Sequence, residues 1–500
     1  MLSRSEINRL IIQAPNLKDM TPSLSAILQT PGGIVRETQA VIALARKFTR
    51  EVVKPYVLEL EKKMTEDPDY LPWEFVKKAN EWGFYTMWIP KLFGGKGYNM
   101  ASMSSFVEEV GSVCLAMANL IGVHYLGVAT LVASWNVKLI DRLCRDVVNG
   151  EKTGEPCLIS LAITEPGAGT DVEEMELADK GDIICKAEKV NGGFRLNGSK
   201  IFISNGHIST WHMTIAYMDL KKPSHTTIMA AVKTGSEGFS FGRMERKMGQ
   251  KGCPASELIF KDCFIPDDLV AIDTTSMGKR NRSKKETIQQ IIDYVVSATR
   301  AGVAAFATGA ARGAFETAIQ FAAETEVNGK LLINHEWAQC MLAEMYKNIA
   351  LARLSYIETN HANNLHGMYK LLQMKPIYYF LKFTPRSLFD KISPILMKQS
   401  VATWIFRKLQ LDGQTDEAFH CTSGWGSLAK FSATDLGIRN CHMALELMGQ
   451  AGLRHDRYAE KFLRDAKLLQ IYEGTNQLNR LNVFKCFLQK DHPQSVVFDE

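Results

Sequence analysis

Residues 162–171 read Ala-Ile-Thr-Glu-Pro-Gly-Ala-Gly-Thr-Asp and follow a short apolar run in a chain of 500 residues. The proline fixes one φ angle, and the two glycines allow the backbone to approach a ligand closely. The hydroxyls of Thr164 and Thr170 can hydrogen-bond to such a ligand. By itself the segment is more typical of a glycine-rich surface turn, so its interpretation depends on the rest of the chain.

The residues around this segment predict a β-domain from about 157 to 272. Alternating runs such as 194–196 and 201–204 are short, and Asn-Gly pairs begin at positions 191, 197 and 205. Alternation with a period of two is typical of half-buried strands, and Asn-Gly pairs favour hairpin turns. We therefore expect hairpins with a turn at each pair.

Apolar residues at helical spacing indicate helical regions on both sides of the β-domain. The predicted fold class is α+β, in the order α, β, α. An extension (1–35) precedes an N-terminal α-helical domain (36–156), the middle domain is a β-barrel or sandwich (157–272), and a C-terminal four-helix bundle (285–490) follows a charged linker. The bundle carries an insertion at about 365–420.

One stretch requires a choice between a membrane span and a buried core. Residues 111–137 contain no Asp, Glu, Lys or Arg, and an uncharged run of this length is long enough to cross a bilayer. Polar residues such as Asn119, His124 and Asn136 interrupt it. We therefore expect a pair of helices buried inside the α-domain.

The composition indicates an ordinary folded protein, with 46% hydrophobic and 23% charged residues. A net charge of +5 is too small to indicate wholesale binding of nucleic acid. The ten cysteines show neither a C-x-x-C motif nor zinc-ligand spacing, which indicates reduced, buried thiols and no metal site. The N-terminus lacks the pattern of a secretory signal. We expect a cytoplasmic protein.

Two further motifs change the interpretation of residues 162–171. Residues 200–206 read Lys-Ile-Phe-Ile-Ser-Asn-Gly, and 471–477 read Ile-Tyr-Glu-Gly-Thr-Asn-Gln. The three motifs together resemble the acyl-CoA dehydrogenase family over about 36–490. Further matching positions are Glu446, Gly449, Gly452, Leu453, Asp456, Lys461 and Asp465.

The resemblance implies a helical domain, a β-domain and a four-helix bundle, with FAD held between the β-domain and the bundle in a homodimer or homotetramer. It also implies α,β-dehydrogenation of an acyl-CoA thioester to a trans-2,3-enoyl-CoA. The flavin supplies the hydride acceptor at N5, and the protein supplies a base and an oxyanion site.

The resemblance makes Glu473 the catalytic base. Members of the family place this glutamate either in the Glu-Gly-Thr turn or on an earlier helix, immediately before the arginine that corresponds to Arg300. Thr299 occupies the earlier place here, so Glu473 is expected to take the pro-R α-proton. The apolar neighbours of Glu473 are consistent with a dry pocket that raises its pKa. The backbone N–H of Glu473 and a flavin ribityl hydroxyl would bind the thioester carbonyl.

The resemblance also assigns binding residues. Thr170, Arg300 and Gly474 would bind the substrate, and Arg300 would help to hold the catalytic turn or the CoA portion. The cofactor-binding set is Leu161, Thr164, Gly169, Thr170, Phe202, Ser204, Gly449, Thr475 and Gln477. Phe202 replaces a tryptophan that is common in the family, which keeps an aromatic face without the indole N–H.

The chain departs from the family at a segment that contacts the FAD diphosphate of a neighbouring subunit. The family's Arg-x-x-Phe-Gly-Lys reads Thr-Glu-Val-Asn-Gly-Lys at 325–330. Downstream, Glu336 replaces the family's usual glutamine. The family has two paired glycines where this chain has Gly449 followed by Gln450. Carboxylates near a diphosphate are unfavourable, so we expect FAD to bind in an altered way or more weakly.

About fifty residues between 365 and 420 exceed the family's usual helix spacing. The segment 368–412 contains eight basic residues among eight aromatic ones, and its only acids are Asp390 and Asp412. This composition suits peripheral contact with the inner face of a membrane through 368–410, or docking of an acidic partner. Packing of the insertion on its own subunit, or on a neighbouring one, is equally compatible with the composition.

The predicted activity leaves the acyl group and the electron acceptor open. Electrons would pass to an electron-transfer flavoprotein or to a membrane-linked acceptor. An acyl-CoA oxidase would share the fold and the base but reduce oxygen. A DNA-associated flavoprotein of the same superfamily, with little dehydrogenase activity, and a scaffold without flavin belong to different functional classes. The intact Glu473 turn and the small net charge disfavour DNA binding.

Overall fold

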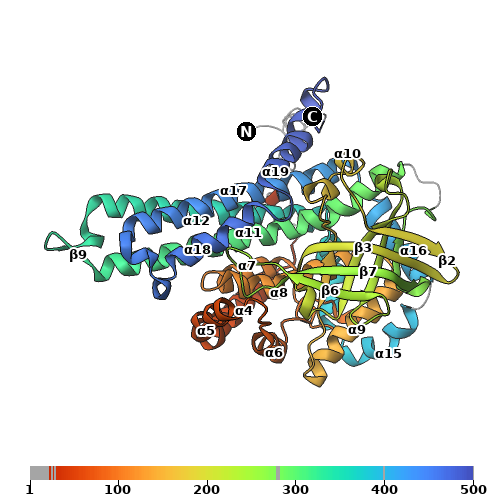
Figure 1. The fold of residues 1–500 in the computed structure, drawn as a ribbon, viewed down its shortest axis with the longest axis horizontal. Helices are drawn as coiled ribbons and strands as arrows, with labels where there is room; N and C mark the ends of the chain where they lie inside the picture. The colour runs from red at the N-terminus through yellow and green to blue at the C-terminus, as the bar shows by residue number, and fades with distance from the viewer. Residues whose placement is uncertain (1–21, 24–25, 27–29, 278–281, 398–399, 499–500) are drawn as a thin grey trace, which may run out of the picture.

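The computed structural model describes residues 22–23, 26, 30–277, 282–397 and 400–498. Figure 1 shows a bundle of long helices, a β-sheet beside one end of it, and shorter helices packed against both. The predicted order of an α-domain, a β-domain and a second α-domain is confirmed. Most of the predicted extension 1–35 lies outside the described residues.

The N-terminal domain packs its helices around a core of aromatic and aliphatic side chains. Phe48, Phe84 and Phe106 lie at its centre, with edge-to-face ring contacts at centroid distances of 4.7 Å. The helices are α4 (Gly33–Phe48), α5 (Lys54–Glu66), α6 (Trp73–Glu81), α7 (Ala101–Gly111), α8 (Leu115–Val132) and α9 (Val137–Thr153).

The uncharged run at 111–137 forms one long helix, α8, instead of the predicted pair. By length and composition α8 could cross a membrane, but 83% of it is buried inside the fold. Its polar side chains are satisfied by the protein: the His124 ring contacts the carbonyl of Tyr85 at 3.1 Å and accepts from the N–H of Ile159. Burial in the fold, as predicted, explains the run.

The β-domain is a single eight-stranded sheet of order β6-β7-β3-β2-β4-β5-β8, with β1 paired to β4. All its pairings are antiparallel except β1 with β4 and a short contact of β2 with β4. The strands are β1 (Ile159–Ala162), β2 (Lys186–Val190), β3 (Gly193–Ser204), β4 (Trp211–Tyr217), β5 (Thr227–Lys233), β6 (Phe239–Met244), β7 (Ala255–Pro266) and β8 (Val270–Asp273). Between β1 and β2 lies a short helix, α10 (Met175–Ala178).

The three Asn-Gly pairs do not all form turns. The pair at 191 makes the β2–β3 hairpin, and the pair at 205 ends β3. The pair at 197 lies inside β3, so that prediction was wrong. Asn197 exchanges two hydrogen bonds with Asp262 on β7, at 2.9 and 3.1 Å, beside a register shift between the strands. The cross-strand pairing thus overrides the local preference for a turn.

A buried ion pair anchors residues 162–171 to the sheet. The Nζ of Lys200 on β3 lies 2.6 Å from a carboxylate oxygen of Glu165, and both side chains are fully buried. Lys200 also donates to the carbonyl of Ile163, and Glu165 accepts from the backbone N–H of Cys185. These bonds satisfy both charges, and they place the loop after β1 against the centre of the sheet.

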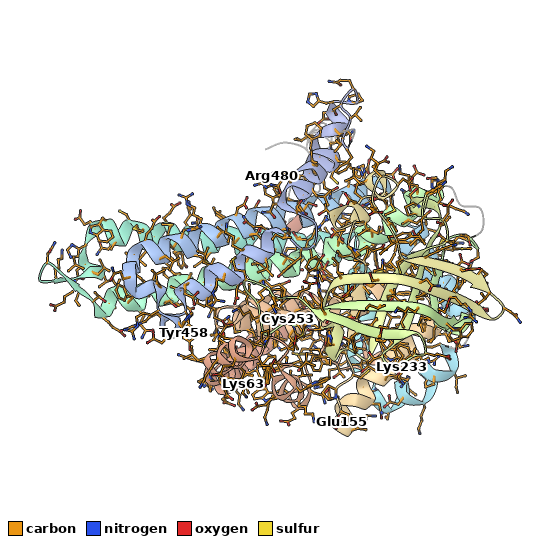
Figure 2. The ribbon with its side chains drawn as sticks, viewed as in Figure 1. Lys63, Glu155, Lys233, Cys253, Tyr458 and Arg480 are labelled. Atoms are coloured by element: carbon orange, nitrogen blue, oxygen red, sulfur yellow. The ribbon has the colours of Figure 1, made fainter. Side chains whose placement is uncertain are left out.

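The β-domain is joined to the N-terminal domain by buried polar contacts. Asn205 donates to the carbonyl of Leu120 on α8, and Asn119 donates to Gln250. Figure 2 shows Cys253 at this junction, where its side chain belongs to the core that the two domains share. The end of β3 is therefore fixed against α8.

The C-terminal domain is a helical bundle built on three long helices, α11 (Lys284–Glu324), α12 (Glu336–Leu365) and α17 (Asp416–Met448). Ser283 and Glu286 form a capping box that starts α11. The shorter α18 (Ala459–Lys467) packs on α11 and α17, and α19 (Asn476–Val483) leads towards the C-terminus. A small hairpin, β9 (Glu326–Val327) and β10 (Lys330–Leu331), caps the far end of α11.

The insertion forms four helices between α12 and α17 and packs against the N-terminal domain. These are α13 (Lys370–Gln373), α14 (Lys375–Phe383), α15 (Arg386–Leu396) and α16 (Ser400–Arg407). The α15 helix contacts the turn at 91–93, and α16 contacts α9. Figure 1 shows α15 beside α9, away from the far end of the bundle.

The ten cysteines are all free, and nine of them are buried as predicted. Cys340 is exposed on α12 and departs from that prediction, because it faces away from the bundle.

Lys200→Met should destabilise the protein by about 3–5 kcal/mol, because it leaves the Glu165 carboxylate buried without its cation. Urea unfolding monitored by circular dichroism measures the change. The matched control is Lys189→Met, which removes an ion pair with Asp267 whose partners are 48% and 56% exposed. That change should cost no more than about 1 kcal/mol. Equal effects of the two substitutions would contradict the anchoring role of Lys200.

Candidate functional site

A cavity of roughly 200 Å³ lies where the three domains meet. Its walls come from α7, α8, the sheet and α11, and from Met368 and Tyr369 at the start of the insertion. Most lining side chains are apolar, and Glu173 and Glu473 are the acidic ones. The cavity therefore combines an apolar interior with a carboxylate from the turn that the sequence singles out.

The backbone of Glu473 adopts a strained conformation. Its φ of 58° lies in the left-handed region, which costs a non-glycine residue about 1–3 kcal/mol. The buried guanidinium of Arg300 donates to the Glu473 carbonyl at 3.2 Å, and Asn479 donates to the same oxygen at 3.3 Å. These bonds hold the turn so that the Glu473 side chain faces the cavity.

Arg300 connects this turn to two further segments. It donates to the hydroxyl of Ser427 on α17 at 2.8 Å and to the carboxylate of Glu173 at 3.2 Å. The prediction that it holds the catalytic turn agrees with these contacts. Its predicted role in substrate binding stays a prediction, since Arg300 does not line the cavity.

The Glu473 carboxyl has a perturbed pKa. Burial raises its pKa to about 7, and the negative charge of Glu173 acts in the same direction. The hydroxyl of Thr299 donates to Oε2 of Glu473 at 2.8 Å and opposes the shift. A carboxyl with such a pKa can exchange a proton near neutral pH.

Lys430 on α17 belongs to the same cluster but was missed by the sequence analysis. Its Nζ donates to the carbonyl of Gly474 at 2.6 Å and to Asn476 at 2.8 Å. Burial, reinforced by the positive charge of Arg300, lowers the pKa of Lys430 to about 7. No local motif marks this lysine, because only the packing of α17 against the turn after α18 brings it to the site.

Four predicted cofactor residues line the cavity together with Glu473: Leu161, Thr164, Phe202 and Ser204. Phe202 has a φ of 56° at an irregularity in the β3–β7 pairing, and its side chain is 54% exposed. The β-bulge thus turns an aromatic ring out of the sheet, a feature that the sequence did not reveal.

The remaining predicted residues lie outside the cavity. Gly169 and Thr170 are on the loop beyond Thr164, and Gly474 follows Glu473. The Thr475 hydroxyl accepts from the N–H of Leu478 and caps α19, and Gln477 is exposed at the start of that helix. Each of these residues comes shortly after a cavity-lining residue in the sequence, either Thr164 or Glu473. None of them lines the cavity itself.

Gly449 is far from the cavity within one subunit. It ends α17 nineteen residues beyond Lys430, which corresponds to about 28 Å at 1.5 Å per residue. It shares the far end of the bundle with the 325–330 hairpin, where Arg457 contacts Glu324 at 3.9 Å. The predicted cofactor role of Gly449 would therefore act on a neighbouring subunit.

Among the described residues, no group of three or more His, Cys, Asp or Glu side chains could hold a metal ion.

Comparison with known families accounts for the order of the three domains. The N-terminal, middle and C-terminal domain models of acyl-CoA dehydrogenase match residues 36–151, 160–263, and 290–368 with 402–487. The chain belongs to the acyl-CoA dehydrogenase family. Members of the family are oxidoreductases. The C-terminal domain model does not match residues 369–401, which lie in the insertion.

Individual relatives share this architecture. A probable acyl-CoA dehydrogenase of Mycobacterium tuberculosis is 28% identical over 450 residues, which cover 90% of this chain and 94% of the relative. A solved structure described as the electron transferring flavoprotein of Acidaminococcus fermentans superposes with a TM-score of 0.69 at 24% identity, covering 91% and 98% of the chains. The structure of a glutaryl-CoA dehydrogenase of Mycobacterium smegmatis in complex with FADH2 superposes with a TM-score of 0.64 at 18% identity. The superposition covers 90% of this chain and 94% of the other.

Thr299→Val should raise the pKa of the Glu473 carboxyl above about 7, because the lost hydrogen bond stabilises the charged form. The protonated form then persists to higher pH. Infrared difference spectra collected across a pH titration measure the protonated carboxyl band, which Glu473→Gln identifies. An unchanged or lowered midpoint in Thr299→Val would contradict the assigned hydrogen bond.

Proposed function

We propose that the protein is an FAD-dependent acyl-CoA dehydrogenase that converts an acyl-CoA thioester into its trans-2,3-enoyl-CoA, with Glu473 as the base. The observation that carries this proposal is the shared cavity. Glu473, with its raised pKa, faces the same space as Phe202, Ser204 and Thr164. An acid–base group thus lies next to surfaces that suit a flat aromatic cofactor.

The residues present fit a flavin. In the described part of the chain, no protein group hydrogen-bonds the hydroxyls of Thr164 and Ser204, so both can contact a ligand. Phe202 presents an exposed ring to the cavity, and a ring of this kind can pack on an isoalloxazine. When bound, FAD would supply the acceptor for the β-hydride.

Glu473 would remove the α-proton of the substrate. With a pKa of about 7, the carboxyl is largely ionised above neutral pH and is a stronger base than an exposed glutamate. An acyl chain that displaces water from the apolar cavity disfavours the charged form further and increases this basicity. Thr299 keeps the carboxylate oriented through its hydroxyl.

The turn would also stabilise the negative charge that develops on the thioester oxygen. Among the described residues, no protein group accepts a hydrogen bond from the Glu473 N–H, while the Glu473 carbonyl is occupied by Arg300 and Asn479. The free N–H is available to the thioester carbonyl. Arg300 and Lys430 add positive charge behind the turn.

The acyl group is proposed to be apolar. Beyond Glu473, the cavity extends between α8 and α11 along Gly122, Val123 and Phe306, towards Met100 and Met103. None of these residues could compensate a charge on the acyl chain, and an unpaired charge buried there would be costly.

The electron acceptor and the subunit arrangement complete the proposal. We propose an electron-transfer flavoprotein as the acceptor; a solved structure that shares the fold is described as such a flavoprotein. The outer face of α12 exposes apolar side chains, including Tyr346, Leu351 and Leu354, which suits contact with a second copy in a homodimer or homotetramer. Such an assembly would bring the far end of one bundle, with Gly449 and Thr325, to the cofactor of another subunit.

Glu473→Gln should reduce the rate of flavin reduction by about 10²–10⁴-fold, because an amide cannot accept the α-proton. Anaerobic absorbance titration with a panel of acyl-CoA thioesters measures this rate as bleaching of the oxidised-flavin band. The control is Glu237→Gln, an exposed residue in the turn between β5 and β6 that does not line the cavity, which should keep the rate of the parent protein.

Normal bleaching by Glu473→Gln would contradict the assigned base, and absence of bound flavin would contradict the proposed function. Rapid oxygen uptake with peroxide release would instead indicate an acyl-CoA oxidase.

A further inference from the structure

The insertion exposes an unusual number of large apolar side chains. Each of them is between 39% and 75% exposed. We call this set the docking face: Met374, Tyr379, Phe380, Phe383, Leu388, Ile392, Ile395, Val401, Trp404, Ile405 and Leu409. Soluble surfaces carry single residues of this kind, whereas a concentration of them marks an interaction site.

The docking face follows helical geometry on each of its three helices. On α14 the exposed rings are Tyr379, Phe380 and Phe383, and on α15 Leu388, Ile392 and Ile395 recur at one side. On α16 and the turn after it, Val401, Trp404, Ile405 and Leu409 do the same. Spacings of three and four residues place each set on one helical side, so the exposure is patterned.

The opposite side of the insertion is firmly attached to the protein. The Lys382 side chain forms an ion pair with Glu37 at 2.9 Å. The Lys91 side chain donates to the backbone carbonyl of Lys382 at 2.8 Å. The side chains of Ser393 and Arg386 donate to the carbonyls of Leu92 and Gly94. The docking face is therefore held outward by specific contacts, and its exposure does not result from poor packing.

The charges around the docking face are positive. Lys375, Lys391 and Lys408 are exposed on the same helices or directly beside them. Asp390 lies between two arginines, at 3.8 Å from Arg386 and 3.9 Å from Arg145. The second acid of segment 368–412 is Asp412. The basic side chains of this surface can therefore attract an anionic partner. The apolar side chains between them can contact an apolar part of the same partner.

We propose that the docking face binds the protein to the surface of an anionic lipid bilayer. Aromatic and aliphatic side chains would enter the headgroup region, and the lysines would contact lipid phosphates. Helices of nine, eleven and eight residues are too short to span the hydrocarbon core, which needs about twenty residues, so they lie on the surface.

A bilayer fits the docking face better than a folded partner does. The apolar side chains project from three separate short helices, and lysines are interspersed among them, as in interfacial membrane segments. Lys408 lies 4.9 Å from the ring of Trp404, which combines an amphipathic ring with a cation at one position. The proposal does not depend on the proposed dehydrogenase activity.

The position of the docking face relative to the cavity gives membrane binding a consequence. The insertion begins at Met368 and Tyr369, which line the cavity, and continues directly into the helices of the docking face. In the membrane-bound protein, the segment that contacts the bilayer would therefore be continuous with one wall of the cavity.

Co-sedimentation of the full chain with vesicles tests the proposal. Vesicles of phosphatidylcholine with phosphatidylglycerol should bind the protein, and vesicles of phosphatidylcholine alone should bind it less. The triple variant Phe380→Ser/Phe383→Ser/Trp404→Ser should lower the partition coefficient more than about tenfold, because each change removes a large apolar side chain from the contact.

The matched control is Leu453→Ser/Leu488→Ser/Val496→Ser, whose three residues are at least 50% exposed but lie outside the insertion. This control should bind like the parent protein, and all variants should retain the parent circular dichroism spectrum. Lys391→Glu/Lys408→Glu should weaken binding to anionic vesicles only.

Two results would overturn the proposal. One is absence of binding to anionic vesicles, or binding that the docking-face variant leaves unchanged. The second combines two observations: the parent protein does not bind vesicles, and the docking-face variant no longer forms the dimer or tetramer of the parent. Sedimentation velocity without lipid measures the oligomeric state. That result would assign the docking face to contacts between copies of the chain.

Discussion

The buried guanidinium of Arg300 is the contact on which the candidate site depends. It joins the strained Glu473 turn to α17 through Ser427 and to the loop after β1 through Glu173. A planar group with several fixed donors suits three partners at once, and a lysine could not reproduce this geometry. Without Arg300 the Glu173 carboxylate would lose its ion pair, and the left-handed backbone of Glu473 would lose its main support.

The balance of charges around Arg300 explains the chemistry of the site. Two carboxylates, Glu173 and Glu473, and two cations, Arg300 and Lys430, share a poorly solvated region. Burial raises the pKa of Glu473 and lowers that of Lys430, so both groups can change protonation near neutral pH. The carboxylate faces the cavity and the cations lie behind the turn, an arrangement that suits proton removal in front and stabilisation of negative charge at the backbone.

The sequence predicted the fold and singled out the Glu473 turn, which lies at the cavity, since both depend on local motifs that stand intact in the chain. It did not predict features that tertiary contacts decide. The Asn197-Gly198 pair lies in a strand because Asn197 bonds to Asp262 across the sheet. Phe202 reaches the cavity through a bulge, and Lys430 joins the site only through the packing of α17. The place of Gly449 follows from the length of α17, a property that a short motif does not contain.

The central claim is that Glu473 exchanges a proton with the substrate α-carbon inside the cavity. The most direct measurement is deuterium incorporation at the α-carbon of an acyl-CoA analogue without a β-hydrogen, because this reading is independent of any electron acceptor. We expect incorporation by the parent protein in heavy water and a loss of about 10²-fold or more in Glu473→Gln. Equal incorporation by both proteins, or none by the parent, would contradict it.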